Sequence, residues 1–214
     1  MDAVSPPRFR SALGPRLLAG AAVALAALAA LAHDEDAFRV RSATFQDGAT
    51  LPASLADNYP PSGPNICTAD GSIGGNTSPE LSWDHAPERT RSFAVVMYDV
   101  TASFTHWSIY NIPGGARGLP VNAGSAASGY GAQVNNDFGS LGYEGPCPPA
   151  GVAPDAHHYV FTVYALDRTL ELPVFANFPQ NAETLEHALA EAAIHGHVLA
   201  QASIGGYFSA TPAP

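Results

Sequence analysis

The sequence predicts a mostly β domain, an antiparallel β sandwich with one short helix in its C-terminal region. Three observations predict this class: short runs of β-branched and aromatic residues, turn clusters between these runs, and a single segment with helical periodicity. The 20 Gly and 19 Pro residues are spread through the body of the chain as turn residues rather than gathered in a linker. About 180 residues follow the N-terminal segment, which is the size of one domain with its own core.

Strands are expected in five runs: residues 38–45, 92–99, 106–112, 159–166 and 198–208. The first run alternates weakly and ends at the turn signal Asp47-Gly48, and Pro113-Gly114-Gly115 ends the third. The run at 159–166 is apolar at positions of both faces, which predicts a central strand.

One helix is expected near the C-terminal end, between Asn181 and Gly196. Asn181 is a suitable N-cap, and Gly196 lies where the C-terminal stop of a helix is expected. Between them, apolar residues recur at helical spacing: Leu185, Ala188, Leu189 and Ala192.

The first 32 residues have the pattern of a secretory signal peptide. Three Arg residues precede an uncharged stretch at 17–32, and Ala30-Leu31-Ala32 offers the small residues that a signal peptidase reads before His33. The apolar stretch is shorter than the roughly 20 residues of a spanning helix, which favours cleavage over the alternative of a membrane anchor. The predicted organisation is a signal peptide at 1–32, a short acidic leader at 33–37 and one domain at 38–214. We therefore expect a periplasmic or secreted protein with no stable membrane insertion after cleavage.

The exported part is strongly acidic. The whole chain has 9 basic and 19 acidic residues, and cleavage after Ala32 removes three Arg and one Asp. This leaves 6 basic against 18 acidic residues, a net charge of −12 with neutral histidines. Such a charge argues against nucleic acid and anionic membrane surfaces as partners. An anionic ligand would need a local pocket that attracts it against the overall field.

Both cysteines, Cys67 and Cys147, lie in the exported part. In an oxidising compartment two cysteines of one domain favour a disulfide, which here closes a loop of about 80 residues. A metal site at these positions is disfavoured, because no second Cys or short Cys/His spacing accompanies either residue.

Three polar clusters at strand ends or in loops are candidate functional sites. They are Asp99, His106-Trp107, and residues 142–149 together with 157–159. Imidazolium and phenol groups donate hydrogen bonds to phosphate or carboxylate oxygens, so together these residues could form an anion pocket. Each cluster also has a structural explanation: a turn former, a half-buried histidine and a solvated loop, respectively. Composition leaves these alternatives open.

Several segments, in order, carry a resemblance to a known family. Residues 74–83 read Gly-Gly-Asn-Thr-Ser-Pro-Glu-Leu-Ser-Trp, and His106-Trp107 opens a run that ends at Ile112-Pro113. Further matching segments are 45–52, 86–94, 136–149, 157–167 and 196–200. Together they resemble the phosphatidylethanolamine-binding protein family, in its bacterial Raf kinase inhibitor-like branch.

The resemblance implies an anion pocket formed by five residues: Asp99, His106, Pro149, His157 and Tyr159. The chain departs from the family where the usual Asp-Pro-Asp-x-Pro is replaced by Asp-Val-Thr-Ala-Ser at 99–103, and where His158 replaces an Arg. Thr101, in place of the second acidic residue, reduces the negative charge of the wall and could donate a hydrogen bond to a ligand. An Asp99 contact with either pocket histidine would favour the imidazolium form.

The sequence therefore predicts an exported, non-catalytic protein that holds a small anionic or phosphate-bearing ligand in a shallow pocket, without a cofactor. No nucleophile elbow, P-loop or His-Glu-x-x-His motif is present. The alternative is an interaction protein that inhibits a protease or modulates an envelope or host target through its surface. A hydrolase or metal site among the eight histidines is disfavoured, because no recognisable metal spacing occurs.

Overall fold

The computed structural model describes residues 36–173 and 179–211, which form nine strands and one helix. The chain divides into two units, 1–37 and 38–214, and these elements belong to the second. The predicted signal peptide lies outside the described residues. Within the described ranges, no helix is long and apolar enough to cross a membrane.

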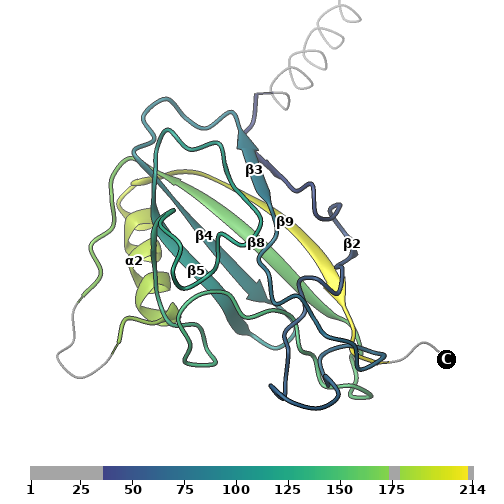
Figure 1. Cartoon of the computed structure of the whole chain (residues 1–214). Helices are drawn as coiled ribbons and strands as arrows, with labels where there is room; N and C mark the ends of the chain where they lie inside the picture. The colour runs from purple at the N-terminus through teal and green to yellow at the C-terminus, as the bar shows by residue number, and fades with distance from the viewer. Residues whose placement is uncertain (1–35, 174–178, 212–214) are drawn as a thin grey trace, which may run out of the picture. The chain divides into compact units, whose positions relative to one another are not determined.

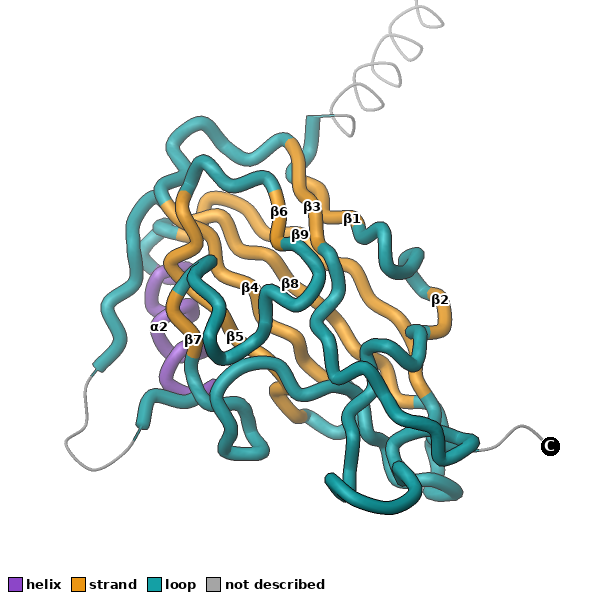
Figure 2. Tube along the Cα trace, in the orientation of Figure 1, coloured by secondary structure: helices purple, strands orange, loops and turns teal. Residues whose placement is uncertain are grey.

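The larger sheet has six strands in the order β2-β9-β8-β4-β5-β7 (Figures 1 and 2). Its members are β2 (Ala49–Thr50), β4 (Ser92–Asp99), β5 (Phe104–Pro113), β7 (Ala132–Gln133), β8 (His157–Leu166) and β9 (Val198–Phe208). The pairs are antiparallel except for the short β2, which runs parallel to β9. β8 lies between β4 and β9, which confirms the central position predicted from its apolar pattern.

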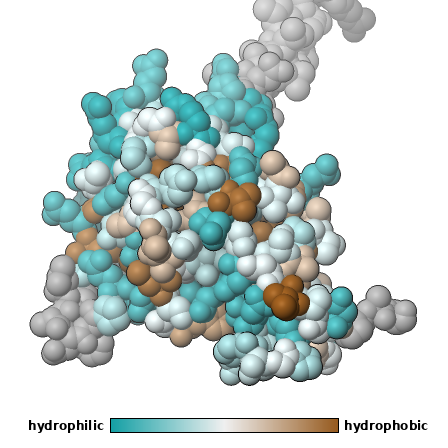
Figure 3. Space-filling view, in the orientation of Figure 1, coloured by the Kyte–Doolittle hydropathy of each residue, from teal (hydrophilic) through white to brown (hydrophobic). Residues whose placement is uncertain are grey.

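The second sheet has three antiparallel strands: β1 (Arg39–Arg41), β3 (Leu81–Asp84) and β6 (Gly118–Leu119). Aromatic and aliphatic side chains of both sheets form one buried cluster, in which the rings of Trp83 and Phe93 lie 5.0 Å apart. The predicted sandwich is therefore confirmed. In contrast to this apolar core, the outer surface is mainly polar. Figure 3 shows polar residues over most of the face in view, with apolar residues in small separate patches.

The first predicted strand, 38–45, is shorter than expected, because it pairs only at Arg39–Arg41. Beyond that point side chains bind the backbone. The amide of Ala43 donates to the Glu80 carboxylate at 2.6 Å, and the amide of Thr44 donates to the hydroxyl of Ser42 at 3.0 Å. These side-chain contacts, one of them within the segment and one from the residue before β3, take the place of the strand ladder that the sequence pattern predicts.

The predicted helix is α2 (Ala182–Ile194), which lies on the outer face of the larger sheet (Figure 1). The predicted N-cap is confirmed, because the amide of Thr184 donates to the side-chain oxygen of Asn181 at 3.1 Å. Gly196 follows the C-cap with a φ of 73°, a conformation that Gly adopts without steric cost. The buried residues of α2, such as Leu185 and Leu189, pack in one cluster with Val96 and Leu166 of the sheet.

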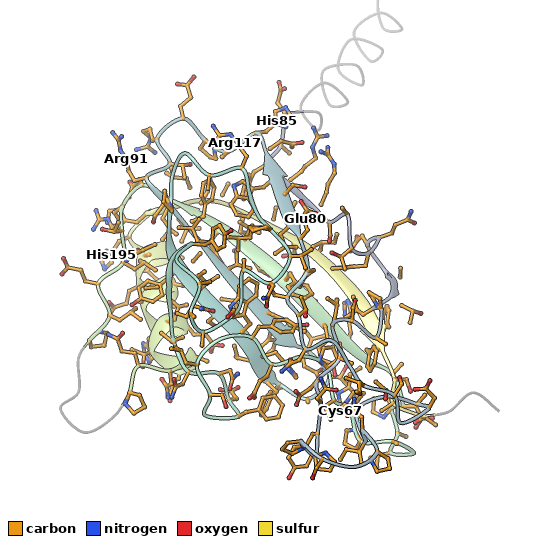
Figure 4. The ribbon with its side chains drawn as sticks, in the orientation of Figure 1. Cys67, Glu80, His85, Arg91, Arg117 and His195 are labelled. Carbon is orange, nitrogen blue, oxygen red and sulfur yellow. A yellow bond between two sulfur atoms is a disulfide. The ribbon has the colours of Figure 1, made fainter. Side chains whose placement is uncertain are left out.

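The predicted disulfide is present and joins two long loops. Cys67 lies between β2 and β3, Cys147 lies between β7 and β8, and their sulfur atoms are bonded. The first loop is also held by Asn65, a buried residue whose side-chain oxygen accepts from the amides of Tyr59 and Cys67, each at 3.0 Å. Figure 4 shows Cys67 at the end of the sandwich away from Arg91 and Arg117.

Reduction of the disulfide is expected to lower stability strongly. The bond joins residues separated by 80 positions, and the loss of a cross-link of that length costs up to about 4 kcal/mol through chain entropy. Urea unfolding with and without dithiothreitol measures the change. The Cys67→Ser/Cys147→Ser variant is the control, since its unfolding midpoint should not respond to reductant. An unchanged midpoint for the reduced wild-type protein would contradict the expectation.

Candidate functional site

The five residues predicted for the pocket lie together at one end of the larger sheet. Asp99 ends β4 and is paired with Tyr159 of β8, and His157 lies two residues before Tyr159 on the same face of that strand. Together with His106 and Pro149 they line one cavity of about 180 Å³. This volume is below the range of about 300–1,000 Å³ that is typical of drug-sized ligands, so the cavity suits a small group.

A β-bulge turns His106 toward this cavity. β4 pairs with β5 through Met97 and Trp107 and then through Tyr98 and Thr105, so His106 is the extra residue on β5. A bulge places two successive side chains on the same face of a sheet and re-aims them locally. Trp107 belongs to the core between the sheets, and His106 lines the cavity beside it.

Asp99 is both a turn former and a member of the pocket. One carboxylate oxygen accepts from the amides of Thr101 and Ala102 at 2.8 and 3.0 Å. The other lies 2.6 Å from Nδ1 of His157, and the Asp99 side chain is 3% exposed. Since an ionised carboxylate only accepts, Nδ1 of His157 carries the hydrogen. Hydrogen bonds to charged groups contribute roughly 1.5–3 kcal/mol, so this carboxylate stabilises the turn and orients the imidazole.

His106 is buried and has a different partner. Its Nδ1 donates to the backbone carbonyl of Glu144 at 2.8 Å. Edge-on contacts surround the ring, with centroid distances of 5.2 Å to Phe104, 5.4 Å to Phe138 and 5.2 Å to Tyr159. Burial lowers the pKa of His106, against the opposing effects of the Glu144 carbonyl and the Asp99 carboxylate. The neutral imidazole is therefore favoured here.

Tyr159 contributes a hydroxyl that stays protonated. The residue is 1% exposed, and burial together with the nearby Asp99 carboxylate raises the pKa of its phenol. A phenol that cannot ionise near neutral pH remains a hydrogen-bond donor.

The segment that carries the Glu144 carbonyl is fixed by its neighbours. The amide of Glu144 donates to the backbone carbonyl of His106 at 3.2 Å, and the amide of Gly145 donates to the side chain of Asn76 at 2.9 Å. A Cβ atom at Gly145 would collide with the backbone carbonyl of Leu55, so the close approach of the two loops requires glycine.

Sequence reasoning missed the aromatic wall of the cavity, which Phe104 and Phe138 supply. Phe104 stands two residues before His106 and shares its face, but the strand predicted from the sequence began only at His106, so alternation was not extended back to Phe104. Phe138 is 48% exposed. It lies in a segment that carries the family resemblance, but the resemblance assigns no ligand-binding role to it.

Two of the residues that depart from the family pattern, Thr101 and His158, do not line the cavity. The Thr101 hydroxyl accepts a hydrogen bond from the amide of His158 at 3.0 Å, so its oxygen takes part in the turn. The His158 ring stacks on Tyr207 at 4.6 Å, because alternation along β8 directs it away from His157. Because Thr101 does not line the cavity, the structure does not place its hydroxyl to donate to a ligand there.

Among the described residues, the remaining histidines form no comparable site. Nδ1 of His197 lies 3.1 Å from the Asp167 carboxylate, and the rings of His195 and His197 are 6.4 Å apart. In the part of the chain that the structure describes, no group of three or more His, Cys, Asp or Glu residues is placed to hold a metal ion.

Comparisons with known proteins found a matching family model and several relatives. A family model described as phosphatidylethanolamine-binding protein matches residues 41–209. A UPF0098 protein of Methanothermobacter thermautotrophicus is 40% identical over 151 residues, which cover 68% of this chain and 89% of the relative. LppC of Mycobacterium tuberculosis, whose name describes it as a lipoprotein, is 33% identical over 152 residues, covering 70% of this chain and 65% of LppC.

Solved structures show the same fold. The crystal structure of YbcL of Escherichia coli, described as a member of the mammalian PEBP family, has a TM-score of 0.62 and 34% sequence identity. The match covers 80% of this chain and 98% of YbcL. A homologue from Chlamydia trachomatis has a TM-score of 0.59 and 25% identity, with 81% and 98% of the two chains covered.

Mild acid is expected to destabilise the protein through His106. Because the pKa of this buried imidazole is lowered, the unfolded state binds more protons than the folded state below a pH of about 6.5. Stability should therefore fall as the pH decreases through that value. Urea unfolding midpoints at pH 7.5 and 5.5 measure the loss, which should be smaller in His106→Gln. The exposed-site variant His195→Gln should behave as wild type, and equal losses in all three proteins would contradict this role of His106.

Proposed function

The chain belongs to the phosphatidylethanolamine-binding protein family, and we propose that it is an exported, non-catalytic protein whose pocket binds a small anionic or phosphate-bearing ligand. One observation carries the proposal. Three strands bring an aspartate, two histidines and a tyrosine to a single cavity of about 180 Å³. Groups of this kind form hydrogen bonds with phosphate and carboxylate oxygens.

Local donors, rather than the charge of the whole molecule, attract the ligand in this proposal. Among the residues that the structure describes, no Arg lines the cavity, and the chain contains no Lys, while the exported part has a net charge of −12. The Tyr159 hydroxyl is a permanent donor, and Nε2 of His157 is a donor whenever that imidazole is charged. The ligand is therefore small and bound by a few directed hydrogen bonds.

A binding role fits the lining of the cavity better than a catalytic one. The described residues that line it include no Ser or Thr hydroxyl and no amine, and Cys147 is held in the disulfide. These groups are the common nucleophiles of covalent catalysis. The Asp99 carboxylate is already engaged by two backbone amides and by His157.

Export is supported by the signal-like N-terminal pattern and by the disulfide. Structural disulfides persist in oxidising compartments, where exported proteins fold. The Cys67–Cys147 bond closes a long loop next to the cavity, so an oxidising location also preserves the site.

Expression of the full chain in a bacterial host should give a protein that begins at His33. N-terminal sequencing of the periplasmic or secreted fraction measures this. Replacement of Ala30 and Ala32 by Phe is the control, since bulky residues at these positions should block cleavage. Recovery of an uncleaved chain from the wild-type sequence would favour the membrane anchor instead.

Phosphate or phosphoethanolamine is expected to shift the imidazole NMR signals of His106 and His157 in a saturable manner. The signals of the exposed His195 serve as the internal control and should not move. The His106→Ala/His157→Ala variant should lose saturable binding. If the two pocket signals do not respond to either compound, the pocket is not the binding site.

A further inference from the structure

The long loop between β2 and β3 carries an isoleucine that is almost fully exposed. This loop projects beyond the end of the sandwich (Figure 1). Ile73 is 86% exposed, the largest fraction among the exposed large apolar side chains of the described residues. A single exposed apolar residue is ordinary by itself. Ile73 differs because side-chain amides hold the backbone both before and after it.

Ser72, the residue before Ile73, is held through its carbonyl oxygen. This oxygen accepts from the side-chain amide of Asn65 at 3.1 Å and from the hydroxyl of Thr68 at 2.7 Å. Asn65 is 6% exposed, and the same amide group donates to the carbonyl of Asp57 at 2.8 Å. The segment that leads to Ile73 is therefore tied to the start of the loop.

Gly74, the residue after Ile73, is held in the same way. Its carbonyl oxygen accepts from the side-chain amide of Asn58 at 2.5 Å. A Cβ atom at Gly74 would lie only 2.4 Å from the carbonyl oxygen of Ala56, so the close contact requires glycine. The amide of Asn76 donates to that same carbonyl at 2.8 Å. The segment that leaves Ile73 is therefore fixed against the body of the domain.

This arrangement presents Ile73 in a form that the cleft of a peptidase can bind. Residues 71–80 form neither helix nor strand. Within the part of the chain that the structure describes, neither the amide nor the carbonyl of Ile73 forms a hydrogen bond. Serine endopeptidases bind an exposed segment through its main chain and take one side chain into a specificity pocket. A segment that is already fixed loses little conformational entropy when it binds.

We propose that Ile73 and its flanking residues form an inhibitory loop for a serine endopeptidase whose specificity pocket is small and apolar. The side chain of Ile73 fills that pocket, since a branched aliphatic group matches an apolar pocket and not one with a carboxylate at its base. Ile73 does not line the anion cavity, so this surface is separate from the proposed ligand site.

The anchors on both sides of Ile73 make the loop an inhibitor rather than a substrate. Attack by the protease serine on the carbonyl carbon of Ile73 forms an ester and breaks the bond to the nitrogen of Gly74, which takes up the proton. Because Asn58 and the backbone contacts hold Gly74 in place, its amine stays beside the ester carbon. Return of this amine re-forms the peptide bond and releases the serine, at the rate advantage of a reaction between held groups.

A change of protease specificity tests the loop. Inhibition constants of the protein expressed from its full sequence are measured with an elastase, whose pocket is small and apolar, and with trypsin, whose pocket binds arginine. The wild-type protein should inhibit elastase and not trypsin. Ile73→Arg should weaken the inhibition of elastase at least about tenfold, the effect of losing a central interface residue, and should inhibit trypsin. The matched control is Ile66→Arg, at a 57% exposed isoleucine of the same loop, which should behave as wild type.

Two results would overturn the inference: a wild-type protein that leaves elastase fully active, or an Ile73→Arg variant that inhibits both enzymes as wild type does. Mass spectrometry of the wild-type mixture with elastase gives an independent criterion that needs no variant. An intact bond between Ile73 and Gly74 after prolonged incubation supports the inference, whereas rapid cleavage there makes the loop a substrate and overturns it. Urea unfolding midpoints equal to wild type show that both Arg variants fold, as expected at exposed positions.

Discussion

The buried carboxylate of Asp99 is the group on which the pocket depends. Its Oδ1 atom accepts two backbone amides and so closes the turn from β4 to β5, while its Oδ2 atom orients His157 on β8. Three adjacent strands are thereby tied at one end of the sheet. A charge with 3% side-chain exposure is tolerated only because donors surround it, so the turn and the pocket stabilise each other.

A second constraint comes from the loops outside the sheet. The Glu144 carbonyl sets the tautomer of His106, and Gly145 and Cys147 fix the segment that carries it against the loop after β2. The disulfide is therefore part of the site as well as of the fold. The result is a small cavity in an acidic protein, lined by the hydrogen-bonding side chains of Asp99, His106, His157 and Tyr159.

Much of the fold could be predicted because the signals are local. The run at 92–99 forms β4 at the predicted boundaries, and Asn181 and Gly196 mark the two ends of α2 as expected. β3 and the two-residue strands β2, β6 and β7 were not predicted. Such short segments become strands through the partner beside them, and a single sequence does not specify that partner.

By itself, the sequence determined the long strands, the helix and its caps, and the pairing of Cys67 with Cys147, because each depends on residue type and spacing along the chain. Tertiary structure alone decided that Asp99 contacts His157 rather than His106, and that a bulge turns His106 into the cavity. The use of Thr101 within the turn was decided in the same way. These outcomes depend on the register between strands distant in sequence, where a shift of one residue redirects every side chain.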